Sequence, residues 1–206
     1  QEKRTMPSEN SQPGLRERKK AAVRANLLDV GRRLFRAQGF DATTIEQICS
    51  EAQISKRTFF RYFPDKESLV FPKREERYAN FIKFLEANRN VEKPFEALRL
   101  ATQIYAEEHN KNKEHYRDIQ SLIQSSLSLR AREREIDQDW QTAIANVLSA
   151  RAGKSPETDL WARILAGAIM GMVRATLTFW YERNCEDDLA ELGLDALEYL
   201  KRGFPE

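Results

Sequence analysis

A short segment of the chain combines cations and aromatic rings at a spacing that suits DNA recognition. Residues 55–63 read SKRTFFRYF. In a helix, Phe59 and Phe63 share one side because they are four residues apart. If that side is buried, the cations and Phe60 face outward along a ridge narrow enough for a major groove. Arg57 or Lys56 would then donate two hydrogen bonds to a guanine edge. The segment therefore predicts a recognition helix.

Two helices in front of this segment are predicted to position it. Apolar residues from Val23 to Leu34 recur at steps of four, three and four, which indicates one long amphipathic helix that ends at Gly39. Thr43, followed three residues later by Glu46, predicts a capping box, and a short helix begins near Thr44. A long helix that braces two short ones is typical of a helix-turn-helix domain.

Local signals also bound the recognition helix and start the next one. Ser55 is expected to cap the recognition helix, and Pro64 must end it. Asp65 is expected to cap a fourth helix that starts at Lys66, with a kink allowed at Pro72. The recognition helix is thus predicted to be short.

Composition and charge agree with a helical DNA-binding protein. The 206 residues are 41% hydrophobic and 32% charged, with only 8 Gly and 7 Pro, so we expect an all-α fold. Residues 1–63 hold 13 Lys/Arg against 7 Asp/Glu, a net charge of +6, whereas the remainder holds 21 against 25, a net of −4. A surface for a polyanion is therefore expected at the front of the chain.

The stretch from Leu27 to Leu69 resembles the DNA-binding domain of TetR-family regulators. It reads LLDVGRRLFRAQGFDATTIEQICSEAQISKRTFFRYFPDKESL. The resemblance rests on Leu-Phe and Gly-Phe around the end of the first helix, Thr-Thr at the start of the second, and Thr-Phe-Phe-Arg-Tyr-Phe followed by Lys-Glu. The residues predicted to bind DNA are Thr44, Ser55, Lys56, Arg57, Thr58, Phe60, Arg61, Tyr62 and Lys66.

Two positions in this stretch depart from the family pattern. Gln53 stands where the family usually has Gly, so a left-handed backbone with a Cβ is expected there, at about 1 kcal/mol. Phe60 stands where Tyr is common, and it lacks the hydroxyl that would donate to a phosphate. We therefore expect Phe60 to contact sugars or thymine methyl groups by packing.

Beyond residue 74, the periodicity predicts helices near 75–88, 93–110, 113–126, 128–151, 157–183 and 187–202. The resemblance implies that they form a second domain, with a pocket for a small inducer and with the last two helices building a homodimer. The abundance of large apolar residues on the central helices favours a hydrophobic effector. The residues predicted to contact it are Phe84, Ile104, Tyr105, Leu122, Ile123, Trp140, Ile144, Ile169, Met170 and Val173.

The predicted helix over residues 157–183 is apolar on two faces. Such a helix must be covered on both sides, and a partner subunit is the economical cover. A transmembrane helix is the alternative, but Arg163 and Arg174 argue against it, because each arginine near a bilayer centre costs about 2.5–3.5 kcal/mol. We expect no membrane span. The predicted dimer interface consists of Leu160, Ile164, Gly167, Gly171, Leu189, Leu192, Leu197 and Leu200.

Neither an enzyme nor a metal protein is indicated. The chain lacks a Gly-rich phosphate loop and a nucleophile motif, so no catalytic residue and no cofactor are predicted. His109 and His115 are six residues apart, off the spacing of one helix face, and are expected to be solvated rather than metal ligands. Cys49 and Cys185 imply no disulfide framework, which favours the cytoplasm.

The predicted organisation is a disordered tail over 1–14, a helix-turn-helix domain over 15–74, and an effector-binding and dimerisation domain over 75–206. The predicted function is a sequence-specific transcriptional regulator that binds a palindromic operator as a homodimer. Repression relieved by a small hydrophobic effector is the expected mode, and activation stays open. An enzyme with a helical cavity and a sequence-independent DNA binder are the alternatives.

Overall fold

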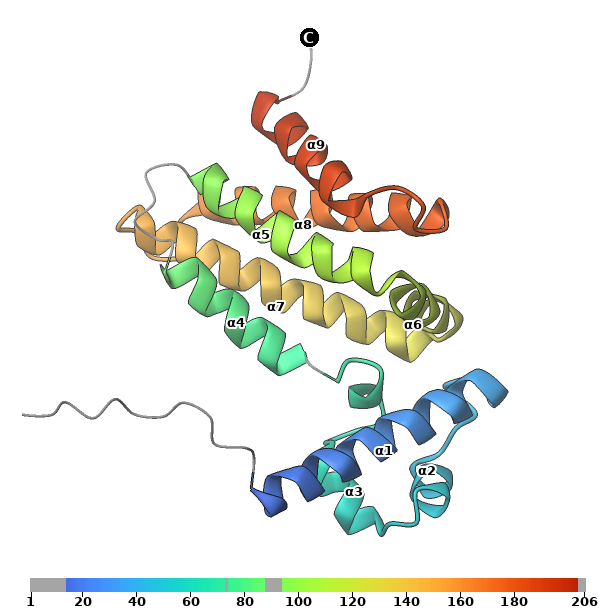
Figure 1. Ribbon diagram of the computed structural model, residues 1–206. Coiled ribbons are helices and arrows are strands. Elements are labelled where there is room, and N and C mark those ends of the chain that lie inside the picture. The colour runs from blue at the N-terminus through green and yellow to red at the C-terminus, as the bar shows by residue number, and fades with distance from the viewer. Residues whose placement is uncertain (1–13, 73, 88–93, 204–206) are drawn as a thin grey trace, which may run out of the picture. The chain divides into compact units, whose positions relative to one another are not determined.

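The computed structural model describes residues 14–72, 74–87 and 94–203, and these form nine α-helices and one 3-10 helix without any β-strand (Figure 1). The all-α prediction is confirmed. The chain divides after Pro72 into two compact units. We call residues 1–72 the N-terminal unit and residues 73–206 the C-terminal unit. The predicted tail over residues 1–14 lies, apart from Gly14, outside the described residues.

Residues 14–72 of the N-terminal unit form three helices and one 3-10 turn. The first helix packs against the second and against the turn, and the second packs against the third. Leu27, Ile48 and Phe59 have no exposed surface, and the ring centroids of Phe59 and Phe63 are 6.0 Å apart on the buried side. The elements are α1 (Leu15–Gln38), α2 (Ile45–Glu51), α3 (Lys56–Tyr62) and η1 (Glu67–Leu69).

The capping box of α2 lies one residue later than predicted. Thr44 is the N-cap: its Oγ1 accepts a hydrogen bond from Gln47 N (3.2 Å), and Gln47 Oε1 accepts one from Thr44 N (2.8 Å). Thr43 is buried instead, and its hydroxyl donates to Gly39 O (2.7 Å). Glu46 therefore plays no part in the box, and the prediction of a Thr43–Glu46 pair was wrong.

The turn before α3 adopts the strained backbone that its sequence indicated. Gln53 has φ 55°, the left-handed region that favours glycine, as predicted. Ala52 N donates to Ile48 O (2.9 Å) and Ile54 N donates to Cys49 O (3.0 Å), so hydrogen bonds hold the backbone on both sides of Gln53. The turn directs the chain from α2 into α3.

The predicted fourth helix does not begin at Lys66. Asp65 Oδ1 accepts a hydrogen bond from Ser68 N (2.8 Å) and caps only the short turn η1. The next helix, α4 (Arg74–Ala87), begins separately. Pro72 explains the break, because it has no N–H to continue the helical hydrogen bonds.

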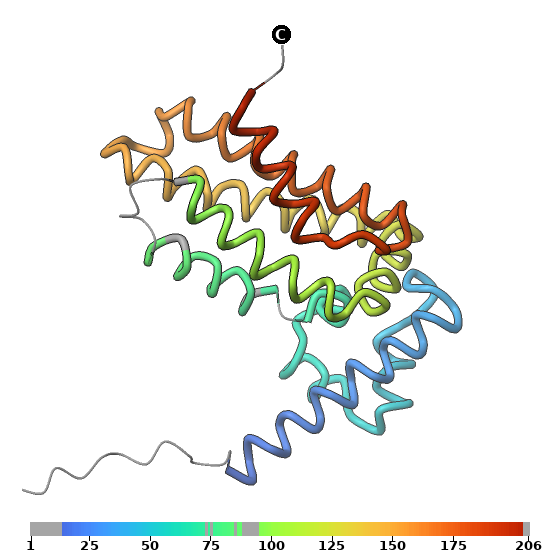
Figure 2. Tube along the Cα trace, turned by 45° about the horizontal axis from the view of Figure 1, so that its top comes forward, coloured from blue at the N-terminus to red at the C-terminus, as the bar shows by residue number. Residues whose placement is uncertain are grey.

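The described part of the C-terminal unit forms six helices, whose bounds lie within three residues of the predicted ones. α7 packs along α8, and α9 lies across α5 and α8 (Figures 1 and 2). A buried cluster around Phe81, Ile144 and Ile169 joins α4, α7 and α8. After α4, the helices are α5 (Pro94–Lys111), α6 (Lys113–Ser125), α7 (Leu127–Arg151), α8 (Leu160–Glu182) and α9 (Leu189–Arg202).

A second cluster fixes the end of α8 near the start of α9. Trp180 is fully buried, and its Nε1 donates to Asp187 O (2.9 Å). Cys185 and Leu189 pack beside it. Cys185 and the other cysteine, Cys49, are free and buried, and burial raises the pKa of both thiols.

The apolar stripe of α9 is covered by helices of the same chain. Leu189 and Leu197 are each 4% exposed, and Leu192 and Leu200 pack against the two buried clusters. Little of Leu189 and Leu197 is therefore left to contact a partner subunit, because the chain itself buries them, and the predicted dimer interface stays a prediction.

Candidate functional site

The outward face of α3 brings several predicted DNA-binding residues together. Phe59 is buried, whereas Phe60 is 52% exposed and meets Phe59 edge to face with the ring centroids 5.4 Å apart. Lys56, Arg57 and Arg61 are also exposed. An exposed aromatic ring flanked by cations can contact base edges, thymine methyl groups and phosphates. The buried ring thus positions the exposed face of the helix.

Three other predicted residues hold the ends of α3. Ser55 Oγ accepts a hydrogen bond from Thr58 N (3.1 Å) and lies 3.0 Å from Thr58 Oγ1. Tyr62 is half-buried, and the guanidinium carbon of Arg61 lies 5.2 Å from its ring centroid. The fourth, Thr44, is exposed at the start of α2, where its hydroxyl caps the helix and, after the hydrogen bond from Lys56, its own hydrogen bond to Glu46 contributes to the lowered pKa of that carboxyl.

An acidic residue that the sequence analysis did not select lies beside the recognition helix. Glu46 of α2 forms an ion pair with Lys56. The hydrogen bond from Lys56 lowers the pKa of Glu46, so the carboxylate is charged at neutral pH. Arg57 and Arg61 form no ion pair with any described residue. They are therefore better placed than Lys56 to offer positive charge to DNA.

Lys66 has a structural role that its sequence position did not reveal. Its Nζ donates to Phe40 O (2.7 Å) and to Thr43 O (2.8 Å), and it lies 4.1 Å from the centroid of the Phe40 ring. Hydrogen bonds from a charged donor each stabilise a protein by about 1.5–3 kcal/mol. Lys66 thus ties the turn after α1 to the segment before η1. Only the third ammonium proton is left for the predicted phosphate contact.

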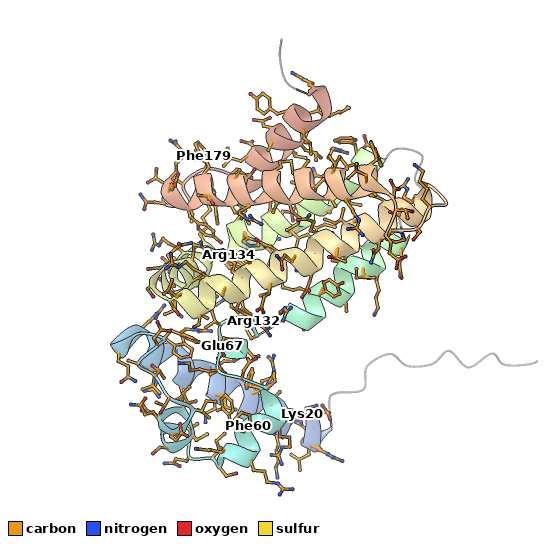
Figure 3. The ribbon with its side chains drawn as sticks, turned by 180° about the vertical axis from the view of Figure 1, so that it is seen from behind. Lys20, Phe60, Glu67, Arg132, Arg134 and Phe179 are labelled. Carbon is orange, nitrogen blue, oxygen red and sulfur yellow. The ribbon has the colours of Figure 1, made fainter. Side chains whose placement is uncertain are left out.

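The first turns of α1 form a basic surface outside the predicted set. Arg24, farther along the helix, lies with its guanidinium carbon 5.1 Å from the centroid of the Phe63 ring, so this side of α1 faces the end of α3. Lys20 shares that side because it lies one turn earlier. Figure 3 shows Lys20 and Phe60 at the same end of the N-terminal unit. The exposed cations of these turns are Arg16, Arg18, Lys19 and Lys20.

The residues predicted to contact an effector only partly come together. Six of them belong to the buried cluster or pack against it: Phe84, Tyr105, Trp140, Ile144, Ile169 and Met170. Ile104 is 52% exposed on α5 and is not part of this cluster, so its contact with an effector stays a prediction. Ile123 is buried, and Leu122 and Val173 are half-buried, but all three lie outside the described cluster.

His109 is not solvated, contrary to the prediction. It is 8% exposed, its ring stacks on Tyr116 with the centroids 3.8 Å apart, and its Nδ1 lies 2.7 Å from Tyr105 O. Burial lowers the pKa of His109 to about 4, against the opposing effect of the hydrogen bond with Tyr105. The imidazole is therefore neutral at pH 7. His115, in contrast, is exposed.

The depressed pKa of His109 predicts that the C-terminal unit loses stability in mild acid. The unfolded chain binds a proton near pH 6.5 and the folded chain only near pH 4, so stability is full above 6.5 and falls as the pH drops. We expect the free energy of unfolding to fall by about 2 kcal/mol between pH 7 and pH 5. Tryptophan fluorescence during urea unfolding measures this, since all three tryptophans lie in the C-terminal unit.

Two variants isolate the contribution of this histidine. His109→Phe keeps a ring against Tyr116 but cannot titrate, so it should lose most of the decrease between pH 7 and pH 5. His115→Gln removes the exposed histidine and should behave as the wild type. An unchanged pH dependence in His109→Phe would refute the assignment.

One apolar face of α8 is not covered by any described part of the chain. Leu160, Trp161 and Ile164 are 69%, 58% and 62% exposed. Gly171 is exposed farther along, whereas Gly167 is half-buried, and a Cβ there would lie 3.5 Å from Gln141 Nε2. By length and composition alone α8 could also cross a membrane, a test that core helices of soluble proteins pass as well. Contiguous exposed apolar surface of this kind marks an interaction site.

Two protein-family models match the chain. The model described as bacterial regulatory proteins of the tetR family matches residues 27–71, which include α2, α3 and η1. The model described as the MftR C-terminal domain matches residues 92–205, more than half of the chain. Together they cover the exposed face of α3 and the helices α5 to α9.

Individual proteins are similar along most of the chain. The HTH-type transcriptional regulator TcmR of Streptomyces glaucescens is 27% identical over 198 residues, which are 92% of this chain and 87% of TcmR. The transcriptional regulator FadR from Bacillus subtilis, solved in complex with stearoyl-CoA, is 21% identical, with a TM-score of 0.60 and coverage of 88% of this chain and 99% of FadR.

A third similar protein shares the fold with a higher TM-score. It is a putative TetR-family transcriptional regulator from Syntrophomonas wolfei, with a TM-score of 0.66 and 19% identity over 90% of this chain and 98% of the other. At these identities the solved structures establish a common fold. The helix-turn-helix predicted for the N-terminal unit is confirmed by this likeness and by the family model.

Proposed function

This chain belongs to the tetR family of bacterial regulatory proteins, and from that membership we propose that it is a cytoplasmic repressor that binds a palindromic operator as a homodimer. It is a DNA-binding transcriptional regulator, as its relatives are. The observation that carries the finer proposal is the face of α3, where Arg57, Phe60 and Arg61 are exposed over buried Phe59. We propose no enzymatic activity.

DNA recognition is proposed to divide between bases and phosphates. Arg57 donates to the O6 and N7 atoms of a guanine, and Phe60 packs against sugars or thymine methyl groups. The hydroxyl of Thr44 and the cations of the first turns of α1 contact phosphates, which fix the position of α3 in the groove but carry no sequence information.

The homodimer is proposed because one recognition helix reads only half of an operator. A two-fold pair of α3 helices fits successive major grooves when the half-sites lie about one helical turn apart. The uncovered face of α8 supplies the surface on which two protomers join. The palindrome then follows from the symmetry of the protein.

A small effector is proposed to release the repressor by changing the separation of the two recognition helices. FadR from Bacillus subtilis was solved with stearoyl-CoA, which supports a ligand with an apolar part. The half-buried rings of Tyr105 and Trp140, which pack against the buried cluster around Phe81, are the proposed contact surface. Such a ligand binds about 1–3 kcal/mol more favourably when the separation of the recognition helices does not match the operator. It then lowers operator affinity roughly 5- to 150-fold, which suffices for derepression.

Selection of DNA from a random pool tests the proposed function. The purified full chain should enrich a two-fold symmetric sequence and should bind it at least about 1,000-fold more tightly than random DNA at fixed salt. Enrichment without symmetry would exclude the dimer on DNA. Equal affinity for selected and random DNA would point to a sequence-independent binder.

The basic first turns of α1 are expected to steepen the salt dependence of DNA binding. In the double variant Lys19→Ala/Lys20→Ala, the slope of log affinity against log salt should become shallower by about 0.9 for each phosphate that the protein no longer neutralises. The decrease in affinity should be the same for operator and random DNA, because phosphates carry no sequence information. Filter binding or fluorescence anisotropy over a salt series measures it.

Removal of two exposed lysines elsewhere controls for net charge. Lys83→Ala/Lys111→Ala takes two positive charges from the exposed surfaces of α4 and α5 in the C-terminal unit. The slope of log affinity against log salt for this control should equal that of the wild type. A wild-type slope in Lys19→Ala/Lys20→Ala would show that the first turns of α1 do not contact DNA.

A further inference from the structure

One cation of the C-terminal unit is partly enclosed without a matching anion among the described residues. Arg77 of α4 is half-buried, and its Nε is shielded from solvent with no hydrogen-bond acceptor among the described residues. No carboxylate in the described part of the chain forms an ion pair with it. Removing a guanidinium group from water is unfavourable unless an anion or hydrogen bonds compensate. An anionic group brought to Arg77 would supply both.

Two carboxylates of this region are already engaged elsewhere, and burial raises the pKa of a third, Glu133, which disfavours its charged form. Glu108 is exposed, and its Oε1 accepts a hydrogen bond from the hydroxyl of Tyr116 (3.1 Å). Asp137 pairs with Arg174, with Nη2 and Oδ2 2.8 Å apart. Neither carboxylate therefore neutralises Arg77.

Aromatic side chains lie beside this cation. The guanidinium carbon of Arg77 is 6.0 Å from the ring centroid of Tyr105. The Phe81 centroid lies 6.1 Å from that of Tyr105 and 4.5 Å from that of Trp140. Tyr105 and Trp140 stay half-buried although they pack against the buried cluster, so part of each ring is accessible to a bound molecule. Such rings bind the apolar body of a ligand.

The positive charge of Arg77 affects the pKa of one tyrosine on each of three other helices. Burial raises the pKa of Tyr105, Tyr116 and Tyr181, and the charge of Arg77 opposes that rise in each of them. These tyrosines belong to α5, α6 and α8. The hydroxyls of Tyr105 and Tyr181 make no hydrogen bond with a described residue, so both can donate to an anion.

We propose that the effector is an amphipathic organic anion, whose charged head group pairs with Arg77 and whose apolar body packs against Tyr105 and Trp140. The inference rests on the proposed ligand-responsive function and narrows its ligand from a hydrophobic compound to one with a carboxylate, phosphate or sulfonate. A planar guanidinium matches such head groups with two parallel hydrogen bonds. The uncharged counterpart of the same ligand loses that pairing.

Two fluorescent probes that differ in one charged group test this assignment. Anilinonaphthalene sulfonate carries the anion, and phenylnaphthylamine is its neutral counterpart. In Arg77→Met, the dissociation constant of the sulfonate should rise about 10- to 100-fold, whereas that of the neutral probe should change less than about twofold. Arg77→Lys keeps the charge but not the planar guanidinium group. Its dissociation constant for the sulfonate should lie between those of the wild type and Arg77→Met. Arg117→Met, an exposed arginine on α6, is the matched control and should bind both probes as the wild type.

Competition with dodecyl ligands identifies the head group of the effector. Measurement of DNA binding distinguishes failure of this inference from failure of the proposed regulator function. Dodecanoate and dodecyl phosphate, each compared with dodecanol, distinguish a carboxylate from a phosphate. Equally weakened binding of both probes in Arg77→Met, unchanged binding of the sulfonate, or no binding of either probe to the wild type would overturn the inference. Operator binding of every variant without probe is measured in parallel, so a failed inference with intact operator binding leaves the regulator proposal standing.

Discussion

Replacement of Ile164 by aspartate is expected to dissociate the homodimer and to abolish operator binding at concentrations where the wild type is fully bound. Ile164 is 62% exposed on the uncovered face of α8, and two-fold symmetry would bury both copies of the new carboxylate. Burying an unpaired charge costs about 3–5 kcal/mol, so the dissociation constant of the dimer should rise at least about 100-fold. Light scattering or sedimentation over a dilution series measures the mass.

Two further variants make this result specific to α8. Ile104→Asp is the matched control, because Ile104 is 52% exposed on α5 and the same substitution there leaves α8 unchanged. Gly171→Asp tests the same face a second time, since a Cβ at Gly171 meets no atom within 4 Å and the protomer can accept it. An Ile164→Asp protein with the wild-type mass at every dilution would exclude α8 as the interface.

Replacement of Arg57 by alanine is expected to weaken binding to the selected operator roughly 5- to 150-fold, equivalent to about 1–3 kcal/mol. Arg57 is exposed on α3 and forms no ion pair with a described residue, so its guanidinium is available for a guanine. Preference at one base pair per half-site should relax in the same variant. Anisotropy titrations with the operator and with single-base substitutions of it measure both effects.

Comparison with Lys19→Ala/Lys20→Ala, the variant that lacks the proposed phosphate contacts of α1, shows whether Arg57 contacts bases. Random DNA should bind Arg57→Ala with little change, whereas Lys19→Ala/Lys20→Ala should weaken operator and random DNA alike. Equally weakened binding of Arg57→Ala to both kinds of DNA would assign this arginine to phosphates. The base contact would then have to come from another residue of α3.

Local signals in the sequence were sufficient to predict most of the helices. The left-handed backbone at Gln53 and the buried pair Phe59 and Phe63 followed from spacing and from the family pattern, because both depend on neighbours in the sequence. The capping box was misplaced by one residue since Thr43 and Thr44 are both good caps. The hydrogen bond from the Thr43 hydroxyl to Gly39 O, within the turn after α1, and the reciprocal hydrogen bonds of Thr44 and Gln47 decide between them.

Contacts between distant segments could not be predicted in the same way. The leucines of α9 form an apolar stripe, and the stripe alone does not tell whether α5 of the same chain or a partner subunit covers it. Lys66, Glu46 and Arg77 were missed or misassigned for the same reason. The groups that define their roles lie on other helices or turns: the carbonyl of Phe40, the ammonium of Lys56 and the ring of Tyr105.

The burial of both native cysteines leaves the protein without an accessible thiolate. Cys49 and Cys185 are at most 5% exposed, and their raised pKa values suppress the reactive form at neutral pH. A single cysteine introduced at an exposed position, such as Ser50→Cys on α2, would therefore label selectively. One spin label on each protomer of the proposed dimer would then report the separation of its two N-terminal units, with and without an effector, in a chain whose own cysteines need no replacement.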